Sequence, residues 1–386
     1  MDKQARQDFL ADLLKIDTIG GHEDRVAMFL KQAFAAHQIK GELLPVVPAE
    51  DGRHIFYAKV GNGNGPTLAF SGHQDVVSIG DIGKWTTDPL GAEVKDGLMY
   101  GRGASDMKSG LAGMAIAILE LADEHYSVNG ELLFMGTVGE ESSTKNHMQG
   151  AQTLAKQGYT DHIDALIIGE PSNGDIVFAT KGSILYKVTS KGIAAHSSTP
   201  EAGYNAIAPL IAYYNEQAKY FAKMTQIDAD LGTTTPVVSK IDGGGQLNSV
   251  PDYAELYVKI RTIPALTNQS ILKHVQQLIN KINRDYQASL SLVVLGDKLP
   301  VKTDANDTFI EMLQQIGSAG LQREVKLKGI SADTDASELT KFKPDIKVGV
   351  FGPGNNSIHK PDENVDLNQY DKFIDIYKQI VKHYFN

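Results

Sequence analysis

The sequence contains no cysteine, which excludes disulfide bonds and thiolate ligands, so any metal site must use histidine, aspartate and glutamate. It also has no apolar run near the roughly 18 residues that a membrane-spanning helix needs. The amphipathic N-terminal segment MDKQARQDFLADLLKI lacks the apolar core and the cleavage site of a secretory signal. From these absences we expect a cytoplasmic protein.

Basic residues are the minority among the charged ones, because 37 Lys and Arg face 47 Asp and Glu, giving a formal net charge of −10. This balance argues against nucleic acid or an anionic membrane as the main partner. A hydrophobic content of 42% and a charged content of 22% are ordinary for a globular protein. A length of 386 residues indicates two domains.

Apolar strand-like runs alternate with helical patterns over the first half of the chain and again near its end. This order predicts an α/β fold with a mostly parallel, mixed sheet flanked by helices. The predicted strands are 55–60, 67–70, 131–138, 164–168 and 347–351. The predicted helices are 2–16, 23–38, 109–123, 147–157, 307–317 and 367–384.

The pattern changes between residues 181 and 295, where a β-α-β-β-α-β order indicates a small two-layer α+β domain. Its predicted strands are 183–189, 234–241, 254–261 and 289–295, and its predicted helices are 202–221 and 268–284. We therefore expect a discontinuous larger domain, 1–180 and 296–386, with this smaller domain inserted into it.

Polar side chains directly follow three of the predicted strands. His73 and Asp75 come after the second strand, Glu140 and Glu141 after the third, and Glu170 after the fourth. In open α/β sheets, ligands bind beyond the carboxyl ends of the strands. Singly, His73 could be an ordinary loop histidine and the glutamate pair a solvated strand end, but their joint placement favours a functional site.

Two further candidates lie in glycine-containing loops. Asp106 sits in the turn YGRGASDMK (100–108), where Gly101 and Gly103 permit a tight backbone, and alone it could simply cap the helix that follows. His359 ends the loop GPGNNSIH and is surrounded by Lys360, Asp362 and Glu363, which could be mere surface polarity.

Histidine and carboxylate ligands without thiolate suit Zn²⁺, Mn²⁺ or Co²⁺. Five candidate ligands exceed what one tetrahedral ion needs, so we expect a pair of ions bridged by Asp106. Such a pair polarises a carbonyl and activates water at neutral pH. One of Glu140 and Glu141 would then bind metal while the other handles protons, and Asp75 would orient the imidazole of His73.

Six motifs together resemble a known enzyme family. They are SGHQDVV, YGRGASDMKSG, GEES, GEPS, AHSSTPEAGYNAI and FGPGNNSIHKPDE. In order, and over nearly the whole chain, they are similar to the di-zinc amidohydrolases that include succinyl-diaminopimelate desuccinylase, acetylornithine deacetylase, aminoacylase and glutamate carboxypeptidase. The resemblance implies a di-zinc exopeptidase-like catalytic domain and a ferredoxin-like dimerisation domain.

The resemblance also implies roles for particular residues. One metal would be held by His73, Asp106 and Glu170, and the other by Asp106, Glu141 and His359. Glu140 would be the general base, Asp75 the carboxylate behind His73, and Asp106-Met107 a cis peptide bond.

For the inserted domain, the resemblance implies that His196 crosses from a partner subunit of a homodimer to stabilise the tetrahedral oxyanion. It implies that Asn248 and Arg261 contact the substrate. The reaction would be hydrolysis of an N-acyl amide, with N-succinyl-LL-diaminopimelate as the first candidate substrate. Acetylornithine, other N-acyl amino acids and dipeptides are alternatives, as is a non-enzymatic dimeric binding scaffold.

Overall fold

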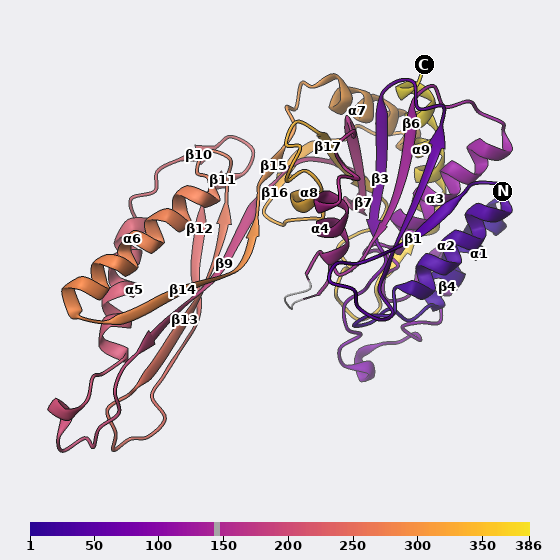
Figure 1. Ribbon diagram of the computed structural model, residues 1–386. Helices are drawn as coiled ribbons and strands as arrows, with labels where there is room; N and C mark the ends of the chain where they lie inside the picture. Colours follow the sequence, from indigo (N-terminus) through magenta and orange to yellow (C-terminus); the bar gives the residue numbers. More distant parts are fainter. Residues whose placement is uncertain (143–146) are drawn as a thin grey trace. The chain divides into compact units, whose positions relative to one another are not determined.

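The computed structural model describes residues 1–142 and 147–386, and the chain divides into two compact units (Figure 1). The first unit contains Met1–Ala179, Lys302–Lys328 and Thr334–Asn386. The second contains Thr180–Val301 and Gly329–Asp333.

The first unit is built on a mixed sheet with the strand order β1-β2-β6-β3-β7-β17-β8-β15, and β16 pairs with β8. Its strands are β1 (Gly41–Pro45), β2 (His54–Gly61), β3 (Thr67–His73), β6 (Glu131–Thr137), β7 (Ala165–Pro171), β8 (Ile176–Thr180), β15 (Val301–Lys302), β16 (Leu327–Ile330) and β17 (Lys347–Gly352). The central strands β6, β3, β7 and β17 run parallel to one another, whereas β1, β2 and β8 pair antiparallel.

Helices lie on both sides of this sheet (Figure 1). They are α1 (Lys3–Lys15), α2 (Asp24–Ala36), α3 (Lys108–Asp123), α4 (Gln149–Lys156), α7 (Thr308–Leu321), α8 (Ala336–Leu339) and α9 (Leu367–Tyr384), together with the 3₁₀ turn η1 (Ile82–Lys84). Helix α3 packs against β3, β6 and β7 and also against α1 and α9, while α4 packs against β6 and α8. Among the described residues, no helix is long and apolar enough to cross a membrane.

The central strands β3 and β6 are buried over nearly their whole length because both faces of the sheet are covered. All seven residues of β3 are buried, as are six of the seven residues of β6. Helix α3 comes unusually close to the sheet at Gly110, where an added Cβ would lie only 1.8 Å from the carbonyl oxygen of Gly169 in β7. Because Gly110 has no side chain, the first turn of α3 can lie directly beside the end of β7.

A small three-stranded sheet joins two segments that are far apart in the chain. It has the order β18-β5-β4, with β4 (Glu93–Lys95), β5 (Leu98–Tyr100) and β18 (Asn364–Asp366). Asn364 pairs with Tyr100, so the loop after β17 ends beside the start of the turn that carries Asp106.

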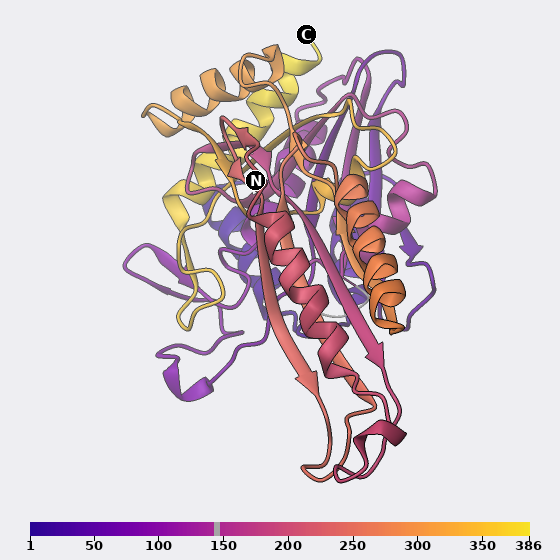
Figure 2. The same cartoon turned by 90° about the vertical axis from the view of Figure 1, so that its left-hand side faces the viewer.

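The second unit is a four-stranded antiparallel sheet with the order β12-β13-β9-β14, and Figures 1 and 2 show both of its helices on one face of that sheet. Its elements are β9 (Gly182–Lys191), η2 (Pro200–Ala202), α5 (Ile207–Phe221), β10 (Ile227–Asp228), β11 (Gly232–Thr233), β12 (Thr235–Gly243), β13 (Tyr253–Thr262), α6 (Asn268–Tyr286) and β14 (Ser289–Lys298). The alternating burial along β13 reflects this arrangement, since every second side chain packs under α5 and α6.

The predicted fold class is confirmed: a mixed α/β fold with a mostly parallel central sheet flanked by helices. Two of the boundaries that differ from the prediction have a clear local cause. The helix predicted to begin at residue 202 begins at Ile207, whose backbone N–H is capped by the Asn205 side chain at 2.8 Å. Strand β14 continues past Gly296 to Lys298 through a shift in register, whereas the glycine predicted its end at 295.

Candidate metal centre

The five predicted metal ligands come from five separate segments that meet at one edge of the sheet in the first unit. His73 is the last residue of β3, Glu170 lies near the end of β7, and Glu141 follows β6. Asp106 lies in the turn before α3, and His359 lies in the loop after β17. The parallel strands end together at this edge, which is why these side chains meet.

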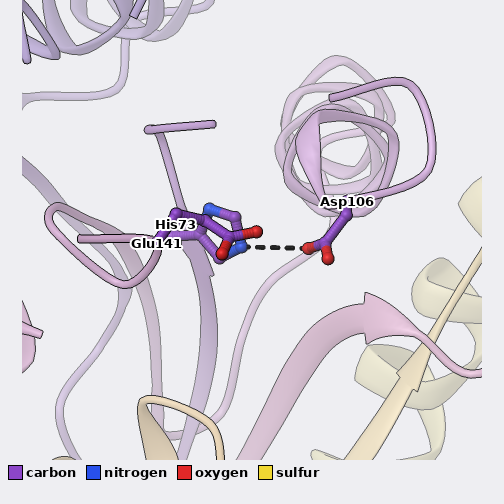
Figure 3. A group of neighbouring side chains, drawn as sticks. All are labelled: His73, Asp106 and Glu141. Atoms are coloured by element: carbon purple, nitrogen blue, oxygen red, sulfur yellow. Dashed lines mark hydrogen bonds and ion pairs between the residues drawn. The ribbon is translucent and has the colours of Figure 1, made fainter. Parts of the chain in front are cut away.

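Asp106 lies between the two imidazoles, with one carboxylate oxygen facing each of them. Its Oδ1 is 3.1 Å from Nε2 of His73, and its Oδ2 is 3.3 Å from Nε2 of His359. Figure 3 shows the contact between His73 and Asp106, with Glu141 beside the imidazole. A carboxylate that faces two separate nitrogen ligands has the geometry of a bridge between two ions.

Each imidazole also has its own second carboxylate. Nε2 of His73 is 3.4 Å from Oε1 of Glu170, and Nε2 of His359 is 2.8 Å from Oε1 of Glu141. Glu140 offers an oxygen to the group formed with His73 and Glu170, whereas its neighbour Glu141 faces His359. Glu141 also forms a group with His73 and Asp106, so both glutamates approach His73 but each meets a different second carboxylate.

The electrostatics of the centre reflect closely spaced buried carboxylates. Burial and the negative charge of Asp106 raise the pKa of Glu170 to about 8, and burial and the charge of Glu170 raise the pKa of Glu140 well above its usual value. Hydrogen bonds to Asp106 and Glu141 raise the pKa of His359 to about 10. Burial acts to raise the pKa of Asp106, but its hydrogen bonds to His359 and His73 hold it below its usual range.

The donor set fits a pair of divalent cations. Four carboxylates and two imidazoles are brought together, with His73 and Asp106 buried and His359 about half exposed, and positive charge is needed to balance the carboxylates. Oxygen and nitrogen ligands of this kind suit Zn²⁺, Co²⁺ or Mn²⁺. His73, Asp106 and Glu170 could hold one ion, and Asp106, Glu141 and His359 could hold the other.

Asp75 contacts this centre in a way that differs from the simplest expectation. Nδ1 of His73 lies 2.9 Å from the main-chain oxygen of Asp75, while the carboxylate of Asp75 is 3.9 Å away. That carboxylate instead accepts hydrogen bonds from the backbone amides of Gly139 at 2.8 Å, Glu140 at 3.3 Å and Glu141 at 2.9 Å. Asp75 therefore orients both the imidazole and the segment that carries the two glutamates.

The polar residues that follow His359 are not all on the surface, although the sequence alone was compatible with that. Glu363 is fully buried, and its carboxylate accepts hydrogen bonds from the backbone amides of Ser105 and Asp106 and from the side chain of Arg102. Neither Glu363 nor Arg102 was predicted from the sequence to support the centre. Two features of the sequence could have indicated this pair. Arg102 lies between the two glycines of the turn, and Glu363 follows the candidate ligand His359 by four residues.

The remaining predicted residues lie in the second unit, where His196 and Asn248 are neighbours. The backbone N–H of Ser197 donates to the main-chain oxygen of Asn248 at 2.9 Å, and His196 bridges to Ser249. Both side chains are exposed, and Nδ1 of His196 is 2.7 Å from Oγ of Ser198.

Arg261 lies at the opposite end of the same sheet. It pairs with Ser183 at one end of β13, whereas Asn248 precedes Tyr253 at the other end. Tyr253 and Arg261 are eight positions apart, which corresponds to roughly 26 Å at about 3.3 Å per strand residue. Arg261 and the pair His196–Asn248 of one chain therefore cannot touch the same small molecule.

Arg261 is also already paired with a carboxylate. Its Nη1 contacts Oδ1 of Asp333, whose Oδ2 accepts a hydrogen bond from Oγ of Ser183 at 2.9 Å. Burial acts to raise the pKa of Asp333, but the charge of Arg261 holds it below its usual value. The nearby Lys181 is buried and donates from Nζ to the main-chain oxygen of Thr233 at 2.6 Å. The sequence did not predict either partner.

Comparisons with known proteins identify the family of the chain. The sequence model of peptidase family M20/M25/M40 matches residues 69–383. Over 397 aligned residues the chain is 35% identical to a Staphylococcus aureus (strain MRSA252) protein named "Probable succinyl-diaminopimelate desuccinylase", covering 96% of this chain and 95% of that protein.

Two solved structures are similar over essentially the whole chain. An M20-family metallo-carboxypeptidase from Sulfolobus solfataricus superposes with a TM-score of 0.78 at 20% identity, covering 100% of this chain and 99% of that one. A dinuclear metal-binding peptidase of the M20 family from Bacillus subtilis superposes with a TM-score of 0.73 at 16% identity, covering 99% and 98%. From the family match and the extent of the sequence identity, the chain belongs to peptidase family M20/M25/M40.

Proposed function

We propose that this chain is a two-metal hydrolase that cleaves an N-acyl amide bond of an amino-acid derivative, with N-succinyl-LL-diaminopimelate as its substrate. The observation that carries the reaction type is Asp106, whose two carboxylate oxygens face His73 and His359. The desuccinylase name of the Staphylococcus aureus relative supports the choice of substrate.

The residues of the centre divide into ligands and a proton carrier. Bound divalent ions supply Lewis acidity, which polarises the scissile carbonyl and makes water a better nucleophile. Glu140 accepts the proton of the attacking water and delivers it to the leaving amine, a task suited to a carboxyl group whose pKa burial and Glu170 raise. Asp75 holds the segment of Glu140 and Glu141 through their backbone amides.

Zinc is the proposed ion, because imidazole and carboxylate ligands without thiolate are typical of catalytic zinc sites. Cobalt and manganese accept the same ligands, so they are alternatives in the assay. The net charge of −10 supports a small molecule rather than nucleic acid or a membrane surface as the partner.

We also propose a homodimer in which His196 and Asn248 serve the active site of the partner subunit. The separation of these two residues from Arg261 along β13 supports this, because one chain cannot bring all three to one substrate. Exposed apolar side chains on strands β12 and β14 support an interface in the second unit. They are Val237, Ile241, Val293, Val294 and Leu295.

A subunit-mixing experiment tests the shared site. His196→Ala and Glu140→Ala are each expected to be inactive alone, whereas mixed dimers are expected to recover up to about half of the sites, because each such dimer assembles one intact set. Light scattering gives the oligomeric state, and exchange of labelled subunits shows that mixed dimers form. Demonstrated exchange without any recovered activity would contradict the shared site.

A substrate panel tests the proposed reaction. The metal-free protein is reconstituted with Zn²⁺, Co²⁺ or Mn²⁺ and assayed with N-succinyl-LL-diaminopimelate, N-acetylornithine, other N-acetyl amino acids and simple dipeptides. We expect the largest kcat/KM for the succinyl substrate. A larger value for another substrate would move the assignment within the family, and tight metal binding with no hydrolysis of any of them would revive the binding-scaffold alternative.

A further inference from the structure

Two loops that are far apart in the chain supply Asp106 and His359, and one buried carboxylate joins them. Oε1 of Glu363 accepts hydrogen bonds from the backbone amides of Ser105 at 2.9 Å and Asp106 at 2.8 Å. Glu363 itself follows His359 by four residues. The backbone of the bridging aspartate is therefore held by a side chain from the loop of the second histidine.

The other carboxylate oxygen is held by an arginine from the same turn as Asp106. Oε2 of Glu363 is 2.5 Å from Nη1 of Arg102. Nη1 of Arg102 also donates to the main-chain oxygen of Lys360 at 3.3 Å, and its Nη2 donates to the main-chain oxygen of Ser78 at 3.0 Å. The guanidinium thus ties together the turn, the segment directly after His359 and the loop that follows β3.

Both side chains of this pair are removed from solvent, since Arg102 is 1% exposed and Glu363 is 0% exposed. The guanidinium of Arg102 lies 5.2 Å from the ring centroid of Trp85, which covers it. A buried ion pair costs desolvation energy and often adds little to stability, so its presence asks for another explanation. Here the explanation is geometric. Asp106 and His359 both lie in loops, outside any strand or helix, and the ion pair holds these two loops in place.

We propose that Glu363 and Arg102 are positioning residues that set the distance between Asp106 and His359, and so the affinity and geometry of the metal pair. Neither side chain belongs to the groups that could hold a metal ion. They act through the backbone of Asp106 and the main chain at Lys360. The inference rests on the two-metal site of the proposed function, and it concerns only how that site is held.

The chain offers a matched control in Glu120, which lies near the C-terminal end of α3. Glu120 is 4% exposed and takes two hydrogen bonds of 2.7 Å from Arg6. Lys108 begins α3, and twelve helical residues separate it from Glu120, or roughly 18 Å. Glu120→Gln therefore disturbs a buried carboxylate that is paired with Arg6 and Lys378 and is remote from the centre.

The test measures metal binding by the metal-free full chain. Co²⁺ and Zn²⁺ affinities are obtained by competition with a chromophoric chelator, and the visible absorption of the Co²⁺-loaded protein reports the coordination geometry. Glu363→Gln is expected to weaken binding by roughly 10- to 100-fold and to change the absorption bands, as is typical when a group that orients a ligand is altered. Glu120→Gln is expected to lower the melting temperature while leaving affinity and spectrum unchanged.

Two milder variants cover the case in which Glu363→Gln does not fold. Glu363→Asp shortens the side chain and Arg102→Lys removes the planar fork, and both should weaken Co²⁺ binding less than Glu363→Gln. Wild-type affinity and spectrum in every folded variant of this pair would overturn the inference and leave the proposed function intact. If the wild-type chain bound neither Co²⁺ nor Zn²⁺, the proposed function itself would fail.

Discussion

At the scale of single residues, two adjacent glutamates of the centre contact different partners. Glu141 faces His359 at 2.8 Å, while Glu140 lies with His73 and Glu170. Asp75 holds both glutamates in place, because its carboxylate accepts hydrogen bonds from the backbone amides of Glu140 and Glu141.

The first prediction contrasts these two glutamates. Glu140→Gln should lower kcat by roughly 10²- to 10⁴-fold, the usual contribution of a general base, while metal content stays unchanged. Glu141→Gln should instead weaken metal binding, because its Oε1 faces His359. Steady-state kinetics and metal analysis of the same preparations distinguish the two. Loss of metal from Glu140→Gln would make that residue a ligand, and normal turnover in the metal-loaded variant would refute its role.

The second prediction concerns Asp333, which neutralises Arg261. Removing this charge in Asp333→Asn should free the guanidinium for an acidic substrate group, with a gain of about 1 kcal/mol, typical of a partly exposed ion pair, and so a roughly fivefold lower KM. The measurement is the ratio of kcat/KM for succinyl and acetyl substrates. Ser183→Ala, which removes only the hydrogen bond to Asp333, is the control and should leave the ratio unchanged. An unchanged ratio in Asp333→Asn would argue against Arg261 as a carboxylate contact.

At the scale of elements, the close approach of helix α3 to strand β7 places Asp106 beside Glu170. Gly110 makes this approach possible, since its Cα lies where a side chain would collide with the main-chain oxygen of Gly169. The position of Asp106 relative to β7 therefore depends on Gly110, a residue without a side chain.

The third prediction follows from that contact. Gly110→Ala should destabilise the chain by roughly 1–3 kcal/mol or more, as overpacking does, and should also weaken metal binding by displacing the turn of Asp106. Gly113→Ala on the same helix is the control, because its Cβ would lie 3.3 Å from the ring of Tyr377 rather than against backbone. Chemical denaturation and chelator competition measure the two effects. Equal stability and equal metal affinity in the two variants would contradict the role of the close approach.

At the scale of the whole molecule, the sign of the stability–pH relation follows from the raised pKa values of Glu170 and His359. In the absence of metal, the folded chain binds protons at Glu170 up to about pH 8 and at His359 up to about pH 10, whereas the unfolded chain releases them nearer pH 4.5 and 6.5. Both groups therefore stabilise the folded state at lower pH, and this stabilisation is lost as pH rises through the folded values.

The fourth prediction is that the chelator-treated protein melts at a lower temperature at pH 8.5 than at pH 6.5. Added Zn²⁺ should raise the melting temperature more at pH 8.5, because the carboxylates and imidazoles have then lost the protons that compete with the ion. Scanning calorimetry at the two pH values, with and without Zn²⁺, gives the comparison. A metal-free protein that is more stable at pH 8.5 than at pH 6.5 would contradict the charge balance of the centre.

The sequence alone determined the class of fold and the ligand types. Strands β3, β6 and β7 were recognisable because both of their faces are buried, so their apolar runs are continuous and end at polar residues. The same logic identified His73, Glu140, Glu141 and Glu170. Short strands such as β5 and β18 escaped prediction, because three residues carry no periodicity of their own.

The tertiary structure alone decided which polar residues support the centre. Glu363 and Arg102 look like surface charges in the sequence, and Asp333 and Arg261 lie 72 positions apart, yet each pair meets inside a unit. Glu363 is held by hydrogen bonds from the backbone amides of Ser105 and Asp106. Every residue except proline has such an amide, so no sequence pattern indicates which ones will bind a distant carboxylate. Local sequence specifies strands and their ends because burial is periodic, whereas contacts between distant loops exist only after the strands have assembled.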